Sequence, residues 1–334
     1  MILKTVAEQK AINKYARQFV KSFKPFIDEQ IKVKLGHQGA SYQAKVLWSK
    51  RLGIWFFSRS LKKIRYWNAF GVGKPVAGSL VSITCEINFP WQAIDRKTGG
   101  AFARDYSGNV FVIHRGKIGG GKKGVGKSLF EHNYRGVWSL MEDGDSLNQV
   151  AVIGALNSSR FALQVAQFVK KIELLKSAAG YSAQTEIMFS ETTFRNNLIG
   201  YLPVQEVVNL TAQCDRDLII KSLAGLLKRW KFKVGNDGDH VLFVMDQAQN
   251  HISHFFEVVT DVREEKVLAA AARLLSQKAA VAGNPLAILV VPEDIMTRYT
   301  QMLESINIAV ITFRLEGEKI IFPDLGKIKL DQNQ

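Results

Sequence analysis

The hydrophobic and polar positions along this chain change period several times, and each change predicts an element boundary. Residues 3–30 carry apolar side chains at spacings of three to six, with Lys and Arg between them, which is typical of a helix. Pro25 interrupts this helix or ends it near its last turn. After Gly36 the chain mixes aromatic and β-branched residues with basic ones, a pattern that predicts strands near 42–48 and 53–58.

The middle of the chain continues with β-type patterns and closes with a helical one. Strands are predicted at 79–91, 108–118 and 149–156, and a helix at 159–180. Residues 42–184 are therefore predicted to form one basic, β-rich module, preceded by an N-terminal helical segment over 1–41. The least regular stretch is 185–208, and we place the domain boundary there.

Helical and strand patterns alternate over residues 210–330. Helices are predicted at 215–230, 263–280 and 293–305, and strands at 231–235, 240–246, 254–261, 286–292, 307–315 and 319–324. This order predicts an α/β domain with a mixed sheet. The fold class expected for the whole chain is α+β, with a basic, β-rich N-terminal part followed by this α/β domain.

Charge separates the two parts of the chain. The net charge is +15, and residues 1–140 hold 25 Lys and Arg against 7 Asp and Glu, whereas residues 141–334 hold 20 against 23. Such an asymmetry predicts that the first part meets a polyanion, with DNA as the partner. The alternative is a generally basic protein without that partner.

Cysteine usage and hydropathy bear on the compartment. Cys85 and Cys214 lie far apart in apolar contexts, which is typical of reduced, buried thiols. No apolar run approaches the roughly 20 residues that span a bilayer. We therefore expect a cytoplasmic protein with no membrane partner.

A run of glycines and lysines lies after the predicted strand 108–118. Residues 121–128, GKKGVGKS, fit the P-loop string GxxxxGK[ST], so nucleotide binding by a P-loop NTPase is one interpretation. The interpretation we favour is a DNA-backbone clamp, in which glycine N–H groups approach phosphates. A solvated basic loop is the third. The candidate phosphate contacts are Lys117, Lys122, Lys123 and Lys127, with His114 and Arg115 at the mouth of the loop where they could reach a base edge.

Aromatic and basic residues interleave over residues 45–69. The aromatic side chains could stack on bases, but such residues more often form core while the neighbouring cations extend into solvent. We expect core for most of them. The predicted phosphate contacts from this stretch are Arg59, Lys62, Lys63 and Arg65.

Two apolar strands joined by a polar turn lie between Asp239 and Asp261, with Asp239 entering the first strand and Glu257 inside the second. This layout resembles the metal-binding hairpin of the restriction-endonuclease-like, or PD-(D/E)XK, nuclease superfamily. The resemblance implies a restriction-endonuclease-like α/β domain over residues 210–330, in the order helix, strand, strand hairpin, helix, strand, helix, strand. It also implies that Asp239 and Glu257 hold Mg²⁺, which activates a water and stabilises charge on the scissile phosphate. Asp246, which ends the first strand, is a rival for the first acid.

The chain departs from the family pattern at Val259, where the family has a lysine that orients the attacking water. Lys266, Arg263 and Lys233 are the candidate replacements, with Lys266 the one we assign to catalysis. Alternatively, Glu257 forms an ion pair with a Lys or Arg of a helix, because an unpaired carboxylate in an apolar strand is costly.

The resemblance and the charge together imply a DNA-binding protein of a prokaryotic defence or restriction type, which hydrolyses DNA with Mg²⁺ if its site is active. A catalytically inactive DNA-binding or scaffold subunit is the first alternative, and the P-loop NTPase is the second. Cleavage of both strands usually needs two active sites, so a homodimer or a larger defence complex is expected for the active form.

Overall fold

The computed structural model describes residues 2–37, 40–119, 124–178, 188–189, 192–193, 209–236, 241–246, 251–295 and 297–328. The chain divides into two compact units. Unit 1 comprises Met1–Thr185 and Ile199–Cys214, and unit 2 comprises Glu186–Leu198 and Asp215–Gln334.

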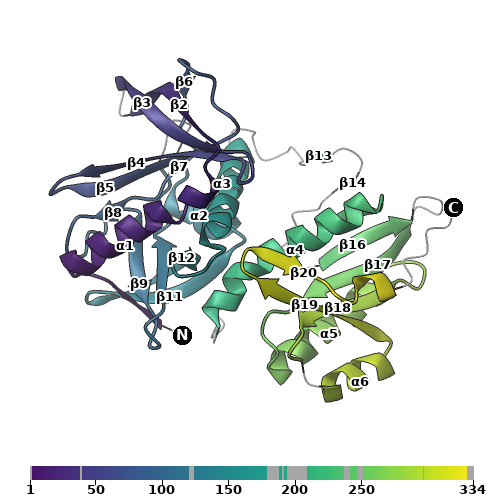
Figure 1. Cartoon of the computed structure of the whole chain (residues 1–334). Helices are drawn as coiled ribbons and strands as arrows, with labels where there is room; N and C mark the ends of the chain where they lie inside the picture. Colours follow the sequence, from purple (N-terminus) through teal and green to yellow (C-terminus); the bar gives the residue numbers. More distant parts are fainter. Residues whose placement is uncertain are drawn as a thin grey trace. The chain divides into compact units, whose positions relative to one another are not determined.

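A small closed barrel forms one part of unit 1 (Figure 1). Its strands are β1 (Ile2–Thr5), β9 (Gly100–Arg104), β10 (Val110–His114), β11 (Val137–Asp143) and β12 (Ser146–Ala155). The barrel closes because β1 pairs with β11 on one side, in parallel, and with β9 on the other. Small and large apolar side chains fill it, among them Leu3, Ala101, Phe111 and Met141.

A second, strongly bent sheet forms the rest of the β structure of unit 1. Its strands are β2 (Glu29–His37), β3 (Ala40–Ser49), β4 (Ile54–Leu61), β5 (Arg65–Val72), β6 (Leu80–Val81), β7 (Cys85–Glu86) and β8 (Phe89–Pro90). They follow the order β6-β2-β3-β4-β5-β7, with β8 also paired to β5. Because β3 and β4 pair only from Leu47–Ser49 to Ile54–Phe56, the β2–β3 and β4–β5 hairpins separate beyond that point (Figure 1).

The helices of unit 1 are α1 (Gln9–Lys21), α2 (Lys127–Asn133) and α3 (Phe161–Ala178), with a 3₁₀ turn η1 (Lys24–Phe26) after α1. A phenylalanine-rich core joins α1 and α3 to the bent sheet and the barrel. Phe19 of α1 lies at its centre, fully buried, with its ring within 6.2 Å of those of Phe23, Phe70, Phe89 and Phe161.

Unit 2 is an α/β domain around a mixed sheet. Its main elements are α4 (Leu210–Arg229), β15 (Lys233–Asn236), β16 (Val241–Asp246), β17 (His251–Val258), α5 (Glu264–Ala279), β18 (Leu286–Pro292), α6 (Thr297–Ser305), β19 (Ile308–Glu316), β20 (Lys319–Ile321) and η2 (Leu325–Lys327). A short hairpin, β13 (Met188–Phe189) with β14 (Thr192–Thr193), belongs to the same unit, whereas the first residues of α4, up to Cys214, belong to unit 1.

The strands of unit 2 follow the order β15-β16-β17-β18-β19-β20. The pairs β17–β18 and β18–β19 are parallel and the others antiparallel, as the sequence pattern predicted for a mixed sheet. Alternate residues of β17 face opposite cores: Phe256 packs with the α4 residues Ile219 and Leu223, and Phe255 packs with the α5 residues Val267 and Leu274. The sheet is therefore covered by helices on both faces.

The structure corrects two predictions for the first part of the chain. Residues 1–41 are not a separate helical segment, because β1 completes the barrel and residues 29–37 form β2. The single strand predicted at 79–91 is three short strands: β6 pairs with β2, whereas β7 and β8 pair with β5 and are separated where Asn68 and Asn88 side chains replace ladder hydrogen bonds. The strands β5, β9 and β11 were not predicted.

His114 is a buried histidine at the end of β10. Its Nδ1 accepts a hydrogen bond from the Gly116 N–H at 3.0 Å, so that nitrogen carries no proton. Burial, opposed by a backbone hydrogen bond at Glu86 and assisted by the charge of Arg115, lowers the pKa of His114 to about 4. The imidazole is therefore neutral in the folded protein at neutral pH.

We expect the free energy of unfolding to fall as the pH drops from 6.5 towards 4. In that window His114 is protonated in the unfolded chain but stays neutral in the folded protein. Its contribution to the free energy of unfolding is therefore complete above pH 6.5 and declines by up to about 1.4 kcal/mol per pH unit below it. Urea denaturation of the wild type and of His114→Gln between pH 7 and 4 measures the difference. The matched control is the exposed His132→Gln; an equal pH dependence in all three proteins would contradict the assignment.

Candidate nucleic-acid interface and predicted metal site

Helix α1 carries a row of four cations on its solvent side. Lys10, Lys14, Arg17 and Lys21 are all exposed and recur at spacings of four, three and four residues, which places them on one face of a helix. The opposite face buries Ile12, Tyr15, Ala16 and Phe19 in the core of unit 1. We call these four cations the α1 stripe.

The α1 stripe costs stability. Like charges three or four residues apart on a helix repel each other by about 0.2–0.5 kcal/mol per pair. Among the described residues none forms an ion pair with the four cations. The charges of these four cations are therefore not balanced by acidic side chains within the described part of the chain.

The bent sheet next to α1 has the same bias. Residues 30–85, from the second residue of β2 to β7, contain ten Lys and Arg and no Asp or Glu, and Glu29 at the start of β2 pairs with one of them, Lys74. Lys32 of β2 lies directly opposite Lys45 of β3, and both side chains are exposed. Directly opposite residues have Cβ atoms about 5 Å apart, and like charges there are destabilising.

The β4–β5 hairpin carries the four predicted cations of this sheet. Arg59, Lys62 and Lys63 are exposed and Arg65 is half-buried at its end. The hairpin joins the α1 stripe: Tyr66, which follows Arg65, donates a hydrogen bond to Asn13 of α1. Arg17 lies close enough to Tyr66 to lower the pKa of its hydroxyl, although burial raises that pKa by more. The stripe and the hairpin therefore form a continuous basic surface.

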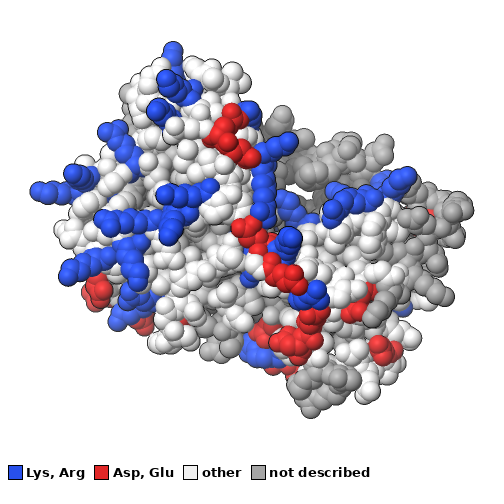
Figure 2. All heavy atoms as spheres, viewed as in Figure 1, with Lys and Arg blue, Asp and Glu red and all other residues white. Residues whose placement is uncertain are grey.

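Figure 2 shows this surface from one side. Lys and Arg side chains spread over the part of unit 1 formed by α1 and the β2–β5 strands, with few Asp or Glu among them in this view. The aromatic residues between the cations are core, as predicted: Trp48, Trp55, Phe56 and Trp67 are buried.

The glycine–lysine loop is held at its base. Ile118 and Val125 form an antiparallel bridge across it, and the buried Lys176 of α3 donates to the Gly119 carbonyl at 3.0 Å. Lys117 and Lys127 are exposed, and Lys127 also pairs with Glu131 at 3.5 Å. The predicted contacts Lys122 and Lys123 lie outside the described residues.

The setting of this loop differs from that of a P-loop. Helix α2 does begin at Lys127, as a P-loop helix would, but it has only seven residues. The preceding strand β10 pairs antiparallel with both neighbours in a closed barrel. A P-loop strand belongs to a series of β-α units, so the barrel gives the NTPase interpretation no support.

The structure corrects the prediction that Arg115 contacts DNA. Its Nε and Nη2 each donate to the Asp143 carboxylate at 2.9 Å, and its Nη1 donates to the Thr98 carbonyl at 2.9 Å. Burial alone would raise the pKa of Asp143, but hydrogen bonds from Arg115 and Thr5 bring it below its ordinary value. Arg115 is therefore committed to an internal, bidentate ion pair that ties β10 to β11. His114, beside it, is buried as well.

Glu257, the predicted metal ligand of unit 2, is paired with arginines. Its side chain is 0 % exposed, and Oε1 accepts hydrogen bonds from Nε of Arg273, at 2.8 Å, and from Nη2 of the same residue. Arg216 of α4 approaches the same oxygen at 3.9 Å and donates to the Val258 carbonyl. The alternative of an ion pair with a helix cation thus describes Glu257 in this structure.

Asp246, the other predicted metal ligand among the described residues, does not lie near Glu257. Asp246 pairs with His251 while Glu257 pairs with Val241, so the two acids are five residues apart along the hairpin, about 17 Å. Metal ligands lie within about 2.6 Å of one ion, so these two acids do not share one. Asp239 lies outside the described residues. In the described part of the chain no group of three or more His, Cys, Asp or Glu could hold a metal ion.

Lys266 is not placed as a substitute for the family lysine. It lies seven residues before Arg273 on α5, which is about 10 Å along a helix axis. Its charge acts on Asp261 instead: burial would raise the pKa of that carboxyl, but hydrogen bonds from Arg263 and the charges of Arg263 and Lys266 lower it. Arg273 occupies the position near Glu257 that the replacement cation was expected to take.

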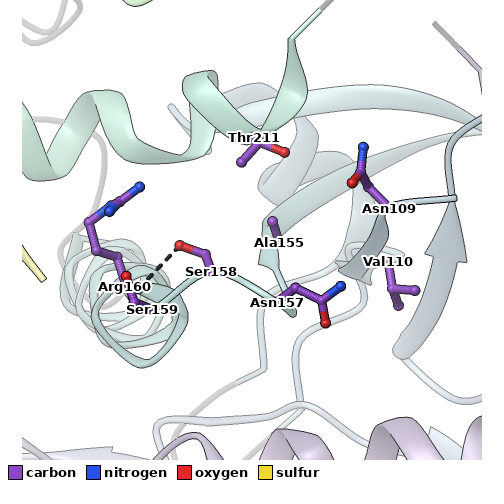
Figure 3. Close-up of a pocket in the computed structure, with 8 residues that line it drawn as sticks. All are labelled: Asn109, Val110, Ala155, Asn157, Ser158, Ser159, Arg160 and Thr211. Atoms are coloured by element: carbon purple, nitrogen blue, oxygen red, sulfur yellow. Dashed lines mark hydrogen bonds between the residues drawn. The ribbon is translucent and has the colours of Figure 1, made fainter. Parts of the chain in front are cut away.

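A cavity of about 210 Å³ lies elsewhere in unit 1, at the connection between β12 and α3 (Figure 3). It is lined by Asn109, Val110, Ala155, Asn157, Ser158, Ser159, Arg160 and Thr211. Ser158 Oγ accepts a hydrogen bond from the Arg160 N–H at 3.1 Å, which orders the first turn of α3. The lining contains none of the predicted site residues.

Sequence reasoning missed the α1 stripe and the arginine partners of Glu257. The stripe could have been predicted, because four cations at helical spacing between Lys10 and Lys21 are visible in the sequence. The arginine partners were harder to predict: the predicted helix 263–280 contains several cations, and only the packing of α5 on β17 shows that Arg273 is the one beside Glu257.

Comparison of the chain with protein-family models, curated proteins and solved structures gives no match. Among the described residues no helix is both long and apolar enough to cross a membrane.

We expect Arg273→Ala to lower the free energy of unfolding by about 2 kcal/mol or more, because it leaves the Glu257 carboxylate buried beside the more distant Arg216. In a double-mutant cycle, adding Glu257→Gln should recover part of that loss. The matched control is Arg314→Ala, which removes an exposed arginine with two acidic partners and should change stability little. Equal stabilities of Arg273→Ala and the wild type in urea denaturation would contradict the ion-pair role.

Proposed function

We propose that this chain is a DNA-binding protein that holds the duplex by its phosphates through unit 1, and whose unit 2 keeps a nuclease-like sheet without cleaving DNA through Glu257. The observation that carries the proposal is the α1 stripe, continued by the cations of the β4–β5 hairpin. Membership of a prokaryotic defence or restriction system rests on the nuclease resemblance alone.

The dimensions of the stripe suit a duplex. From Lys10 to Lys21 it extends about 16 Å along the helix. Duplex DNA carries one negative charge per about 1.7 Å of its axis, so the stripe can lie along a stretch with about ten phosphates. Additional cations on the β2–β3 and β4–β5 hairpins can extend the contact.

The packing of α1 favours a nucleic acid over a membrane surface as the polyanion. A helix that lies on a membrane inserts its apolar face between the lipids. The apolar face of α1 is instead buried in unit 1 through Ile12, Tyr15 and Phe19. Only its cationic face is available to a partner.

The state of Glu257 supports a non-cleaving unit 2. Element order from α4 through the β15–β17 strands, α5 and β18 is the order that the nuclease resemblance implies. The acid expected to bind Mg²⁺, however, already has its charge balanced by Arg273 and Arg216. A carboxylate that is fully buried and bonded to arginine through Oε1 differs from a Mg²⁺ ligand, which faces a site open to the ion and its waters.

Substituting Lys10, Lys14, Arg17 and Lys21 by Gln should weaken DNA binding and its dependence on salt. Each phosphate contact adds about 0.9 to the slope of log K against log salt, so we expect the slope to fall by about 3 to 4. Fluorescence anisotropy with a labelled duplex over a range of salt concentrations measures it.

The matched control removes the same charge from unit 2, at the exposed Lys221, Lys228, Arg229 and Lys319. It should leave the slope near that of the wild type. Equal slopes for the stripe variant and the wild type would contradict the proposed role of α1. Absence of duplex binding by the wild type at low salt would contradict the proposed function itself.

Supercoiled plasmid should stay intact when incubated with the wild-type protein and Mg²⁺ or Mn²⁺, because Glu257 is committed to arginine. The measurement is the conversion of supercoiled to nicked or linear DNA. Nicking that disappears in Glu257→Ala would contradict a non-cleaving unit 2 and restore the active-nuclease alternative.

A further inference from the structure

The tip of the β4–β5 hairpin combines an exposed apolar residue with cations. Leu61 and Arg65 are the last paired residues, so Lys62, Lys63 and Ile64 form the tip. Ile64 is 68 % exposed, and both lysines are exposed beside it. Arg59 lies on the same hairpin, and no acidic residue occurs anywhere in residues 30–85.

The tip does not have the residues that would make its turn most stable. The Ile64 N–H donates to the Leu61 carbonyl at 3.0 Å, and Lys63 between them has φ of 63°. Turns give such a position to Gly or Asn, because left-handed backbone costs other residues roughly 1–2 kcal/mol. Polar residues are also the usual choice where Ile64 stands. The tip therefore keeps a cation and a β-branched apolar side chain at the cost of local stability.

The hairpin is stiff enough to present this residue. All eight residues of β4 pair with all eight of β5, from Ile54 with Val72 to Leu61 with Arg65. Phe57 and Trp67 pack against each other with ring centroids 5.1 Å apart, and Tyr42 of β3 packs on both. Ile64 therefore lies at the tip of a fully paired hairpin whose strands are also held by aromatic packing.

We propose that Ile64 is a wedge that enters between two base pairs while Lys62, Lys63 and Arg59 hold the flanking phosphates. This inference rests on the proposed DNA binding and adds how the duplex is deformed. Apolar wedges in DNA-binding proteins partly unstack a base step and kink the duplex. The surrounding cations favour this partner over a protein surface, since DNA supplies both the phosphates and the apolar base faces.

A wedge makes a prediction about DNA that phosphate binding alone does not make. Unstacking costs less at a mismatched step than at a paired one. The wild type should therefore bind a duplex with one central T·T mismatch about tenfold more tightly than the same duplex fully paired. Fluorescence anisotropy at a single salt concentration gives both affinities.

Ile64→Ala should reduce this preference to about onefold and Ile64→Leu should keep it. The matched control is Leu147→Ala, which truncates a residue that is 55 % exposed and lies opposite Glu142 on the β11–β12 hairpin. It should keep the preference of the wild type. Because Ile64 is exposed in a turn, its variants should fold, and circular dichroism checks this.

Two results overturn the wedge while leaving the proposed function standing: equal binding of both duplexes by the wild type, or an undiminished preference in Ile64→Ala. Absence of binding to either duplex at low salt overturns the DNA-binding function and the wedge with it.

Discussion

The packing of Phe19 against rings from four other positions is the interaction on which unit 1 depends. Its partners come from the turn between α1 and η1, from β5, from β8 and from α3, so a single side chain fixes one helix against the bent sheet and a second helix. Burial of one such ring contributes several kcal/mol. That contribution offsets the repulsion along the other face of α1, where four cations stand without acidic partners among the described residues. One face of α1 thus contributes to the core, and the opposite face contributes to the basic surface.

The two units differ in where their notable charged side chains lie, at the surface or in the interior. Unit 1 has exposed cations on α1 and on the β4–β5 hairpin, whereas Arg115, whose side chain is 10 % exposed, is paired with Asp143. Unit 2 buries a carboxylate, Glu257, and satisfies it with arginines from α4 and α5. Exposed charge is available to a partner, and buried charge is used internally. This contrast is the reason why we propose unit 1 as the part that contacts nucleic acid and a structural role for Glu257.

Much of the fold was predictable because the apolar periods are long and regular. Every helix and main-sheet strand expected over 210–330 is present, with bounds shifted by a few residues. The prediction of one strand over 79–91 was wrong because the apolar pattern shows neither the change of pairing partner from β2 to β5 nor the Asn68 and Asn88 side chains that separate β7 from β8. The site was harder to predict: exposure of Lys62 and Lys63 follows from their place in a turn, but the burial of Arg115 depends on Asp143, 28 residues later. Glu257 needed a partner on chemical grounds, and only packing could identify Arg273.

Lysine reactivity in the presence of DNA tests the central claim most directly. Limited acetylation of the full chain with and without a saturating duplex, followed by mass spectrometry, reports which lysines the duplex covers. The account predicts strong protection of Lys10, Lys14, Lys62 and Lys63, and unchanged reactivity of Lys221, Lys228 and Lys319 in unit 2. Protection of the unit 2 lysines, with α1 and the hairpin tip left reactive, would contradict it.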